Sequence, residues 1–195
     1  MNTGAPSAAI VVRDAAASDI PHIQAIYAHH VRHGLASFEE IPPDVAEMMR
    51  RFEAITTRNL PYLVAEITEP ATAAPVVQGY AYAGPYRTRP GYRFTVENSI
   101  YVAPGGQRRG LGRALLEALI RRCTAAGYRQ MVAVIGDSAN VASIRLHESF
   151  GFERVGVLRS VGFKFGRWVD SVLLQRPLGE GDATLPAAPP TGWRG

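Results

Sequence analysis

Cysteine and lysine are almost absent from this sequence of 195 residues, which contains one of each. A single cysteine, Cys123, excludes an internal disulfide, and its position on an apolar helical stripe indicates core packing. Because Lys164 is the only lysine, arginine supplies nearly all of the positive charge behind the net charge of +4. Arginine binds phosphate and carboxylate groups through paired N–H donors, so the charge favours anionic ligands. A compositional bias toward arginine would give the same count.

Long apolar runs and long basic runs are also missing. No stretch approaches the roughly 20 apolar residues of a membrane-spanning helix. The N-terminus has no basic segment followed by an apolar core, so we expect no signal peptide, no membrane partner and a cytoplasmic protein. Aromatic residues do not alternate with arginines, so we expect no nucleic-acid partner. His29 and His33 stand one helical turn apart without a third ligand, so we expect no metal site.

The apolar pattern predicts one α/β domain over residues 9–177, between a disordered tail (1–8) and a flexible, Gly/Pro/Ala-rich tail (178–195). Alternating and short apolar runs predict strands over residues 10–13, 62–67, 76–84, 94–102, 131–135, 153–158 and 169–175. Helical spacing predicts helices over residues 20–31, 44–55, 111 to a stop at Gly127, and 138–150. This order of elements indicates a mixed, partly antiparallel sheet flanked by helices.

A glycine-rich turn joins a predicted strand to a predicted helix within residues 99–114. Arg108, Arg109 and Arg113 lie at or near the helix N-terminus, where each cation is disfavoured by about 0.3–1 kcal/mol. A bound anion would reverse that sign, because free backbone N–H groups and arginines together make a site for a pyrophosphate. The alternative is a plain strand-to-helix turn with solvated arginines.

Two common nucleotide motifs do not fit this turn. A P-loop ends in Gly-Lys-Ser/Thr, whereas residues 112–114 are Gly-Arg-Ala. The dinucleotide fingerprint needs a third glycine where Leu115 stands. Residues 107–112, Gln-Arg-Arg-Gly-Leu-Gly, instead resemble the acetyl-CoA pyrophosphate loop (Gln/Arg-x-x-Gly-x-Gly/Ala) of the GNAT superfamily of N-acetyltransferases.

Further segments resemble the phosphinothricin N-acetyltransferase branch of this superfamily. They are Ala-Tyr-Ala-Gly-Pro (81–85), Glu-Asn-Ser-Ile-Tyr-Val (97–102), Val-Ala-Val-Ile-Gly (132–136), Ile-Arg-Leu-His-Glu (144–148) and Gly-Phe-Lys-Phe-Gly-Arg-Trp (162–168). The resemblance implies the GNAT fold, a mixed, mostly antiparallel sheet of about six to seven strands with about four helices. It also implies a homodimer that uses acetyl-CoA to acetylate a small amino acid such as phosphinothricin, methionine sulfoximine or methionine sulfone.

Two residues are the candidates for acid–base chemistry. Glu97 stands where the family has its base carboxylate, and a carboxylate can take the proton of the attacking amine directly or through water. Strand alternation places Glu97, Ser99 and Tyr101 on one face, where they would meet the substrate. His147 stands where many superfamily members have tyrosine, so it is either an acid or base, or a packed helix histidine.

The resemblance also assigns residues to the two substrates. For acetyl-CoA, it implies a set on the strand, the turn and the late helix: Ile100, Tyr101, Val102, Gln107, Arg108, Arg109, Gly110, Leu111, Gly112, Arg113 and Asn140. For the amino acid, it implies Phe38 as an apolar wall, Arg87 and Arg89 beside Tyr92 as anion-binding groups, and Ser99. The alternative for the two arginines is a solvated loop.

Other functions remain open at this point. The same fold acetylates protein N-termini and aminoglycosides, and a non-catalytic CoA-binding or RNA-associated module is a further alternative. An acidic pocket would favour a polyamine or an aminoglycoside, whereas Arg87 and Arg89 favour an anionic substrate. Glu97 and the complete glycine-rich turn argue against a non-catalytic module.

Overall fold

A computed structural model describes residues 9–68 and 74–193, so the predicted N-terminal tail and most of the loop predicted at residues 69–75 lie outside it. Within the described residues, seven strands form one sheet in the order β1-β2-β3-β4-β5-β7-β6. The strands are β1 (Ile10–Asp14), β2 (Tyr62–Thr68), β3 (Pro75–Pro85), β4 (Thr95–Val102), β5 (Gln130–Gly136), β6 (Glu153–Lys164) and β7 (Arg167–Pro177). Only β4 and β5 pair in parallel among these neighbours, which confirms the mixed, mostly antiparallel sheet.

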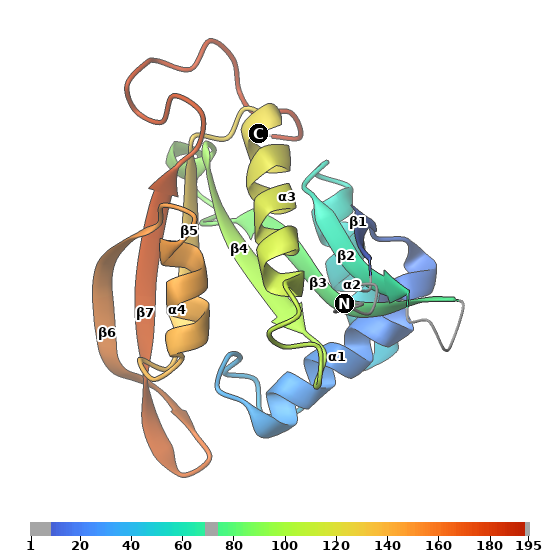
Figure 1. Ribbon diagram of the computed structural model, residues 1–195. Coiled ribbons are helices and arrows are strands. Elements are labelled where there is room, and N and C mark those ends of the chain that lie inside the picture. The colour runs from blue at the N-terminus through green and yellow to red at the C-terminus, as the bar shows by residue number, and fades with distance from the viewer. Residues whose placement is uncertain (1–8, 69–73, 194–195) are drawn as a thin grey trace, which may run out of the picture.

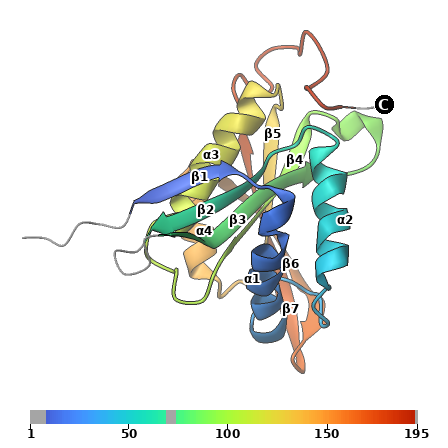
Figure 2. The same cartoon turned by 90° about the vertical axis from the view of Figure 1, so that its right-hand side faces the viewer.

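Four α-helices cover the sheet on both faces within the described residues (Figure 1). They are α1 (Ile20–His33), α2 (Val45–Thr56), α3 (Leu111–Ala125) and α4 (Val141–Glu148). Figure 2 shows α1 and α2 on one side of β1–β3 and α3 on the other. None of the helices in the described residues is long and apolar enough to span a membrane.

The helix starts follow the local sequence. Asp44 caps α2 by accepting a hydrogen bond from the backbone N–H of Glu47 at 2.7 Å. Asn140 caps α4 by accepting from the N–H of Ser143 at 3.3 Å. Gly110 precedes α3 with a φ of +86°, a conformation that favours glycine.

The predicted elements are confirmed in kind and order, and the lengths of β6, β7 and α4 differ most from the prediction. Strand β6 runs to Lys164, whereas the prediction ended at residue 158. Strand β7 begins at Arg167 and ends at Pro177, whereas the prediction was 169–175. A bulge between Leu158 and Gly162 interrupts the register of β6, so its apolar alternation breaks where the prediction stopped. Helix α4 is shorter than the predicted 138–150, because its cap is Asn140.

Strand β4 divides the molecule into two packed faces. Val96, Ile100 and Val102 belong to the cluster that contains α3 and α4. Tyr101 belongs to the cluster formed by α1, α2 and the tyrosines of β2 and β3. The predicted alternation therefore holds in this strand, and its two sets of side chains face different layers of the fold.

The pairing of β4 with β5 stops before either strand ends. It runs only from Thr95–Gln130 to Asn98–Ala133, whereas the strands continue to Val102 and Gly136. The two strands part beyond that point (Figure 1). The edge of β4 from Ser99 onward is thus open toward β5 in the described structure.

The segment after β7 runs back along the domain. Leu178 is fully buried, and the N–H of Thr191 donates to the carbonyl oxygen of Ala126 at 2.8 Å. Gly192 lies so close to the carbonyl of Arg58 that a Cβ there would overlap it. The flexibility of residues 178–195 stays a prediction.

Candidate active site

A small cavity of about 50 Å³ lies where β4 and β5 part, and we call it the splay cavity. Residues from both strands, from α4 and from the loop after α1 line it: Ala36, Asn98, Ser99, Ile100, Tyr101, Val134, Ile135, Gly136, Asn140, Ser143 and His147. The cavity therefore reaches the backbone edge of β4 that no strand covers.

A larger groove of about 400 Å³ opens between the starts of α3 and α4, and we call it the α3–α4 groove. Its lining holds most of the residues predicted for the cofactor: Ile100, Val102, Gln107, Arg108, Gly110, Leu111, Gly112, Arg113 and Asn140. It shares Ile100, Asn140, Ser143 and His147 with the splay cavity, so the two adjoin each other. Tyr101 lines only the splay cavity, and Arg109 does not line the groove.

The glycine-rich turn brings backbone close to this groove. Gly106 is buried, and a Cβ there would lie 3.0 Å from the side chains of Leu111 and Val102. The N–H of Gly105 donates to Oε1 of Gln107 at 2.9 Å, which closes the turn. No residue lining the groove in the described structure is acidic, while two arginines are present. Helix N-terminal N–H groups with these cations make a site suited to an elongated polyanion.

Glu97 lies on the opposite face of β4, near Tyr82 of β3. It is half-buried, and this burial raises the pKa of its carboxyl group while the positive charge of Arg87 partly offsets the effect. The side chains of Tyr82 and Ser99 are hydrogen-bonded beside it. Tyr101 packs edge-on against Tyr27, with ring centroids 5.1 Å apart. A carboxyl group with a raised pKa is a better proton acceptor than an exposed one.

His147 is 4% exposed, and both of its ring nitrogens have partners. Nδ1 lies 2.8 Å from the carbonyl oxygen of Ser143 and therefore donates, so Nε2 accepts from Nδ2 of Asn98 at 3.2 Å. Burial lowers the pKa of the imidazole, which favours this neutral form. His147 lines both cavities, so its packed position and its predicted catalytic role are compatible, and the role stays a prediction.

The predicted substrate residues do not form one cluster. Arg87 is exposed, lies over the ring of Tyr86 at 5.0 Å and acts on the charge of Glu97. Arg89 is exposed at the start of a short 3₁₀ turn, Pro90–Tyr92. Tyr92 lines a separate hollow together with Trp193 of the C-terminal segment.

Phe38 comes from the loop after α1 and lies beside Gly136 at the splay cavity. A Cβ at Gly136 would be 3.3 Å from its ring, and Gly136 lines that cavity. Phe38 and Ser99 are thus both associated with the splay cavity, and Arg87 is associated with Glu97.

Sequence analysis missed a tyrosine-lined cavity of about 260 Å³ beneath α2. Its lining is mostly aromatic and apolar: Tyr27, Met48, Arg51, Ala54, Ile55, Tyr62, Tyr80 and Tyr82. It is connected to the β4 face through Tyr82, which contacts Ser99. The alternation of Tyr80 and Tyr82 with Tyr62 on the neighbouring strand was a signal that could have revealed it.

Comparison with known proteins identifies the family. The family described as "Acetyltransferase (GNAT) domain" matches residues 12–173. The phosphinothricin N-acetyltransferase of Alcaligenes faecalis is 55% identical over 176 residues, which cover 90% of this chain and 85% of that protein. A methionine sulfoximine/methionine sulfone acetyltransferase of Pseudomonas paraeruginosa is 44% identical over 84% of this chain and 92% of its own.

A solved structure extends the comparison to the fold. The phosphinothricin acetyltransferase of Sinorhizobium meliloti, crystallised with acetyl-CoA, superposes with a TM-score of 0.85. It is 49% identical, and the match covers 93% of this chain and 94% of that one.

Proposed function

The chain belongs to the GNAT family of acetyltransferases, and we propose that it transfers the acetyl group of acetyl-CoA to the α-amino group of a small amino acid. The observation that carries this proposal is that the α3–α4 groove adjoins the splay cavity at the open edge of β4. At this opening, a substrate seated in the groove would lie next to the unpaired edge of β4. The names of the relatives favour phosphinothricin, methionine sulfoximine and methionine sulfone as substrates.

The α3–α4 groove fits acetyl-CoA by charge and shape. The N–H groups at the start of α3, with Arg108 and Arg113, would hold the pyrophosphate, and Asn140 would face the pantetheine arm. Bound acetyl-CoA supplies the thioester that the amine attacks. Gln107, Gly110 and the other turn residues contribute backbone and polar contacts to the same groove.

On the other face, Glu97 takes the proton that the α-ammonium group must lose before it can attack. N–H groups on the open edge of β4, from Ser99 onward, stabilise negative charge that develops on the thioester oxygen. The nitrogen–carbon bond forms, the carbon–sulfur bond breaks, and the second proton that the amine nitrogen loses goes to the departing thiolate, which leaves as the free thiol of CoA. Direct attack in a ternary complex needs no enzyme nucleophile, so Cys123, which is fully buried, has no part in it.

Arg87 and Arg89 are the proposed partners of the substrate carboxylate or of an anionic side chain. Their support is the exposed position of both guanidinium groups and the effect of Arg87 on the charge of Glu97. A cationic aminoglycoside would gain nothing from these groups, which is why we rank this alternative below a small amino acid.

A panel assay with release of free thiol tests the proposal. Acetyl-CoA is offered with phosphinothricin, methionine sulfoximine, methionine sulfone, an aminoglycoside and a peptide with a free N-terminus. We expect the highest kcat/KM for an anionic amino acid. A clear preference for the peptide or the aminoglycoside would overturn the substrate class, and no thiol release with any amine would favour the non-catalytic alternative.

We also propose a homodimer that acts in the cytoplasm, with small molecules rather than nucleic acid or membranes as its other partners. The β6–β7 hairpin, at the outer edge of the sheet in Figure 1, supports the dimer because many of its large apolar side chains are exposed. These side chains are Val155, Val157, Leu158, Val161, Phe163, Phe165 and Trp168. Light scattering after gel filtration should give twice the chain mass of 21.1 kDa. A mass of one chain would refute the dimer.

A further inference from the structure

The loop between α1 and α2, residues 34–44, covers one side of the splay cavity. Ala36 lines the cavity directly. The carbonyl of Leu35 lies against Gly136, where a Cβ would overlap it. Phe38 contacts the same glycine with its ring. The position of this loop therefore determines the shape of the cavity on that side.

Lys164, the only lysine of the chain, holds this loop from β6. Its Nζ donates to the carbonyl oxygens of Gly34 at 3.0 Å and of Ser37 at 2.7 Å. The residue is 1% exposed, although a buried ammonium group is costly unless it is hydrogen-bonded. Glu39 and Glu40, on the loop itself, are the acidic groups that act on it, and burial lowers the pKa of the ammonium group. The two hydrogen bonds to the loop carbonyls offset the cost of burying this cation.

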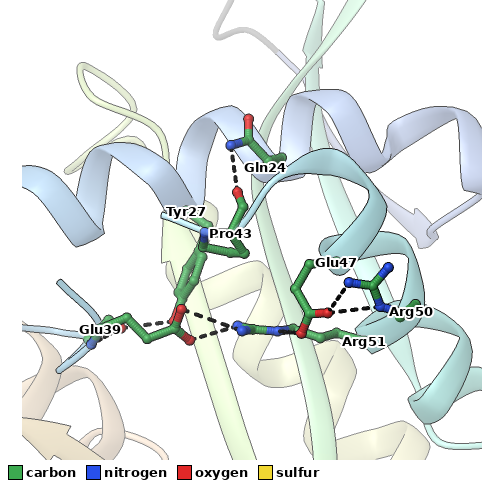
Figure 3. Close-up of polar contacts among 8 residues, drawn as sticks. Gln24, Tyr27, Glu39, Pro43, Glu47, Arg50 and Arg51 are labelled. Carbon is green, nitrogen blue, oxygen red and sulfur yellow. Dashed lines mark hydrogen bonds and ion pairs between the residues drawn. The ribbon is translucent and has the colours of Figure 1, made fainter. Parts of the chain in front are cut away.

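Arg51 of α2 holds the same loop from the other side (Figure 3). Its guanidinium group donates to Glu39 at 2.7 Å and to Glu47 at 2.8 Å. The hydroxyl of Tyr27 donates to Glu39 at 2.9 Å. Arg51 is thus paired with one carboxylate of its own helix and with Glu39, and the second contact connects α2 to the loop.

Gly162 shows how closely the loop is fitted. A Cβ at this position of β6 would lie 2.5 Å from the ring of Phe38. Gly162 and Lys164 thus act on the loop together, one by close approach and the other by hydrogen bonds.

We propose that Lys164 is a positioning residue for the amino-acid substrate, which fixes the α1–α2 loop over the splay cavity so that Ala36 and Phe38 form the wall of the amine site. This inference rests on the proposed function. Acetyl-CoA would bind in the α3–α4 groove, which this loop does not line.

The test compares Lys164→Met with wild type and with Arg129→Met. The control removes a cation that also donates to a backbone carbonyl, that of Gly181, at the opposite end of β5. For Lys164→Met, we expect the KM of the amino acid to rise about 10- to 100-fold, the scale of losing one or two hydrogen bonds to a charged group, while the KM of acetyl-CoA changes less than about twofold. Hydrogen exchange of residues 34–40, without any substrate, should be faster than in wild type and in the control.

The outcomes are separable. An unchanged amino-acid KM, equal changes in both KM values, or unchanged exchange of the loop would overturn the inference. If Lys164→Met does not fold, Gly162→Ala provides a second test of the inference. This substitution displaces Phe38 and leaves the ammonium group of Lys164 in place. It should raise the KM of the amino acid selectively, and an unchanged KM would count against the inference. If wild type acetylates no amino acid, the proposed function fails, while the exchange experiment still decides whether Lys164 holds the loop.

Discussion

Replacing Glu97 by glutamine removes the proposed base and keeps the shape of the side chain. Glu97 is half-buried on β4, and Ser99 and Tyr82 lie beside it, so a neutral amide fits without a buried charge left behind. The change therefore isolates proton transfer from packing. We expect the fold and the affinity for acetyl-CoA to be preserved.

The magnitude follows from what the carboxylate does. Positioned general bases contribute about 10²–10⁴ to a rate, so kcat/KM at pH 7 should fall by that factor. Burial raises the pKa of Glu97, and Arg87 partly offsets this effect. The deficit should shrink as the pH rises, since the amine is then already deprotonated.

The assay is thiol release at saturating acetyl-CoA, over a range of pH values and amino-acid concentrations. In wild type, kcat/KM should rise with pH through a Glu97 pKa that lies above the ordinary value, because the base works only when ionised. This limb should be absent from Glu97→Gln. The exposed Glu53 provides the control, and Glu53→Gln should behave as wild type. Full activity of Glu97→Gln at pH 7 would refute the assignment.

Three further predictions follow from other parts of the structure. Gly112→Phe places a bulky side chain in the α3–α4 groove and should raise the KM of acetyl-CoA, measured by initial rates, with little change for the amino acid. Alanine at Arg87 or Arg89 should raise the KM of an anionic amino acid by about 10- to 100-fold, the scale of a lost charge-assisted hydrogen bond, and an equal effect on an amidated substrate would contradict it. Arg13 donates to the largely buried Asp19 and holds the pKa of that carboxyl below its usual range. The stabilisation by this ion pair is therefore present above the pKa of Asp19 in the unfolded state and is lost as the pH falls through the folded-state pKa. In denaturant titrations, Asp19→Asn should lower the free energy of unfolding at pH 7 by about 2 kcal/mol, and this free energy should then decline less on acidification than in wild type.

Much of the fold could be predicted because its signals are local. Apolar spacing located the helices, and the turn at Gly110 carries its own conformational signature, a glycine with positive φ before a helix. The strand β6 was underestimated because it lies at the edge of the sheet, where a bulge and exposed side chains remove the alternation on which the prediction depends. The predicted boundaries were wrong where tertiary contacts, rather than the local sequence pattern, determine the end of an element.

The contacts that shape the site could not be predicted from local pattern. Lys164 reaches its acceptors across 127 and 130 residues of sequence, and no periodicity indicates that such a pair will meet. The partner of His147 is Asn98, which is 49 residues away in the sequence. The tautomer and the neutral state of His147 depend on this contact and on burial, so the sequence alone could not predict them. Glu97 could be identified as a base by resemblance, but its raised pKa depends on burial that only the fold provides.

The side chains of β4 alternate between the two faces of the sheet, and this alternation explains the place of the strand in the candidate site. Alternation sends Ile100 and Val102 toward the α3–α4 groove, and it sends Glu97, Ser99 and Tyr101 toward the face where we propose that the amine binds. An intact β4–β5 ladder would separate these two sets by a continuous layer of hydrogen-bonded backbone. Because pairing stops at Asn98, this layer opens beside the splay cavity. In the function that we propose, the freed edge of β4 would offer N–H groups to the reacting carbonyl, and the break in the sheet would join the two binding surfaces into one site of reaction.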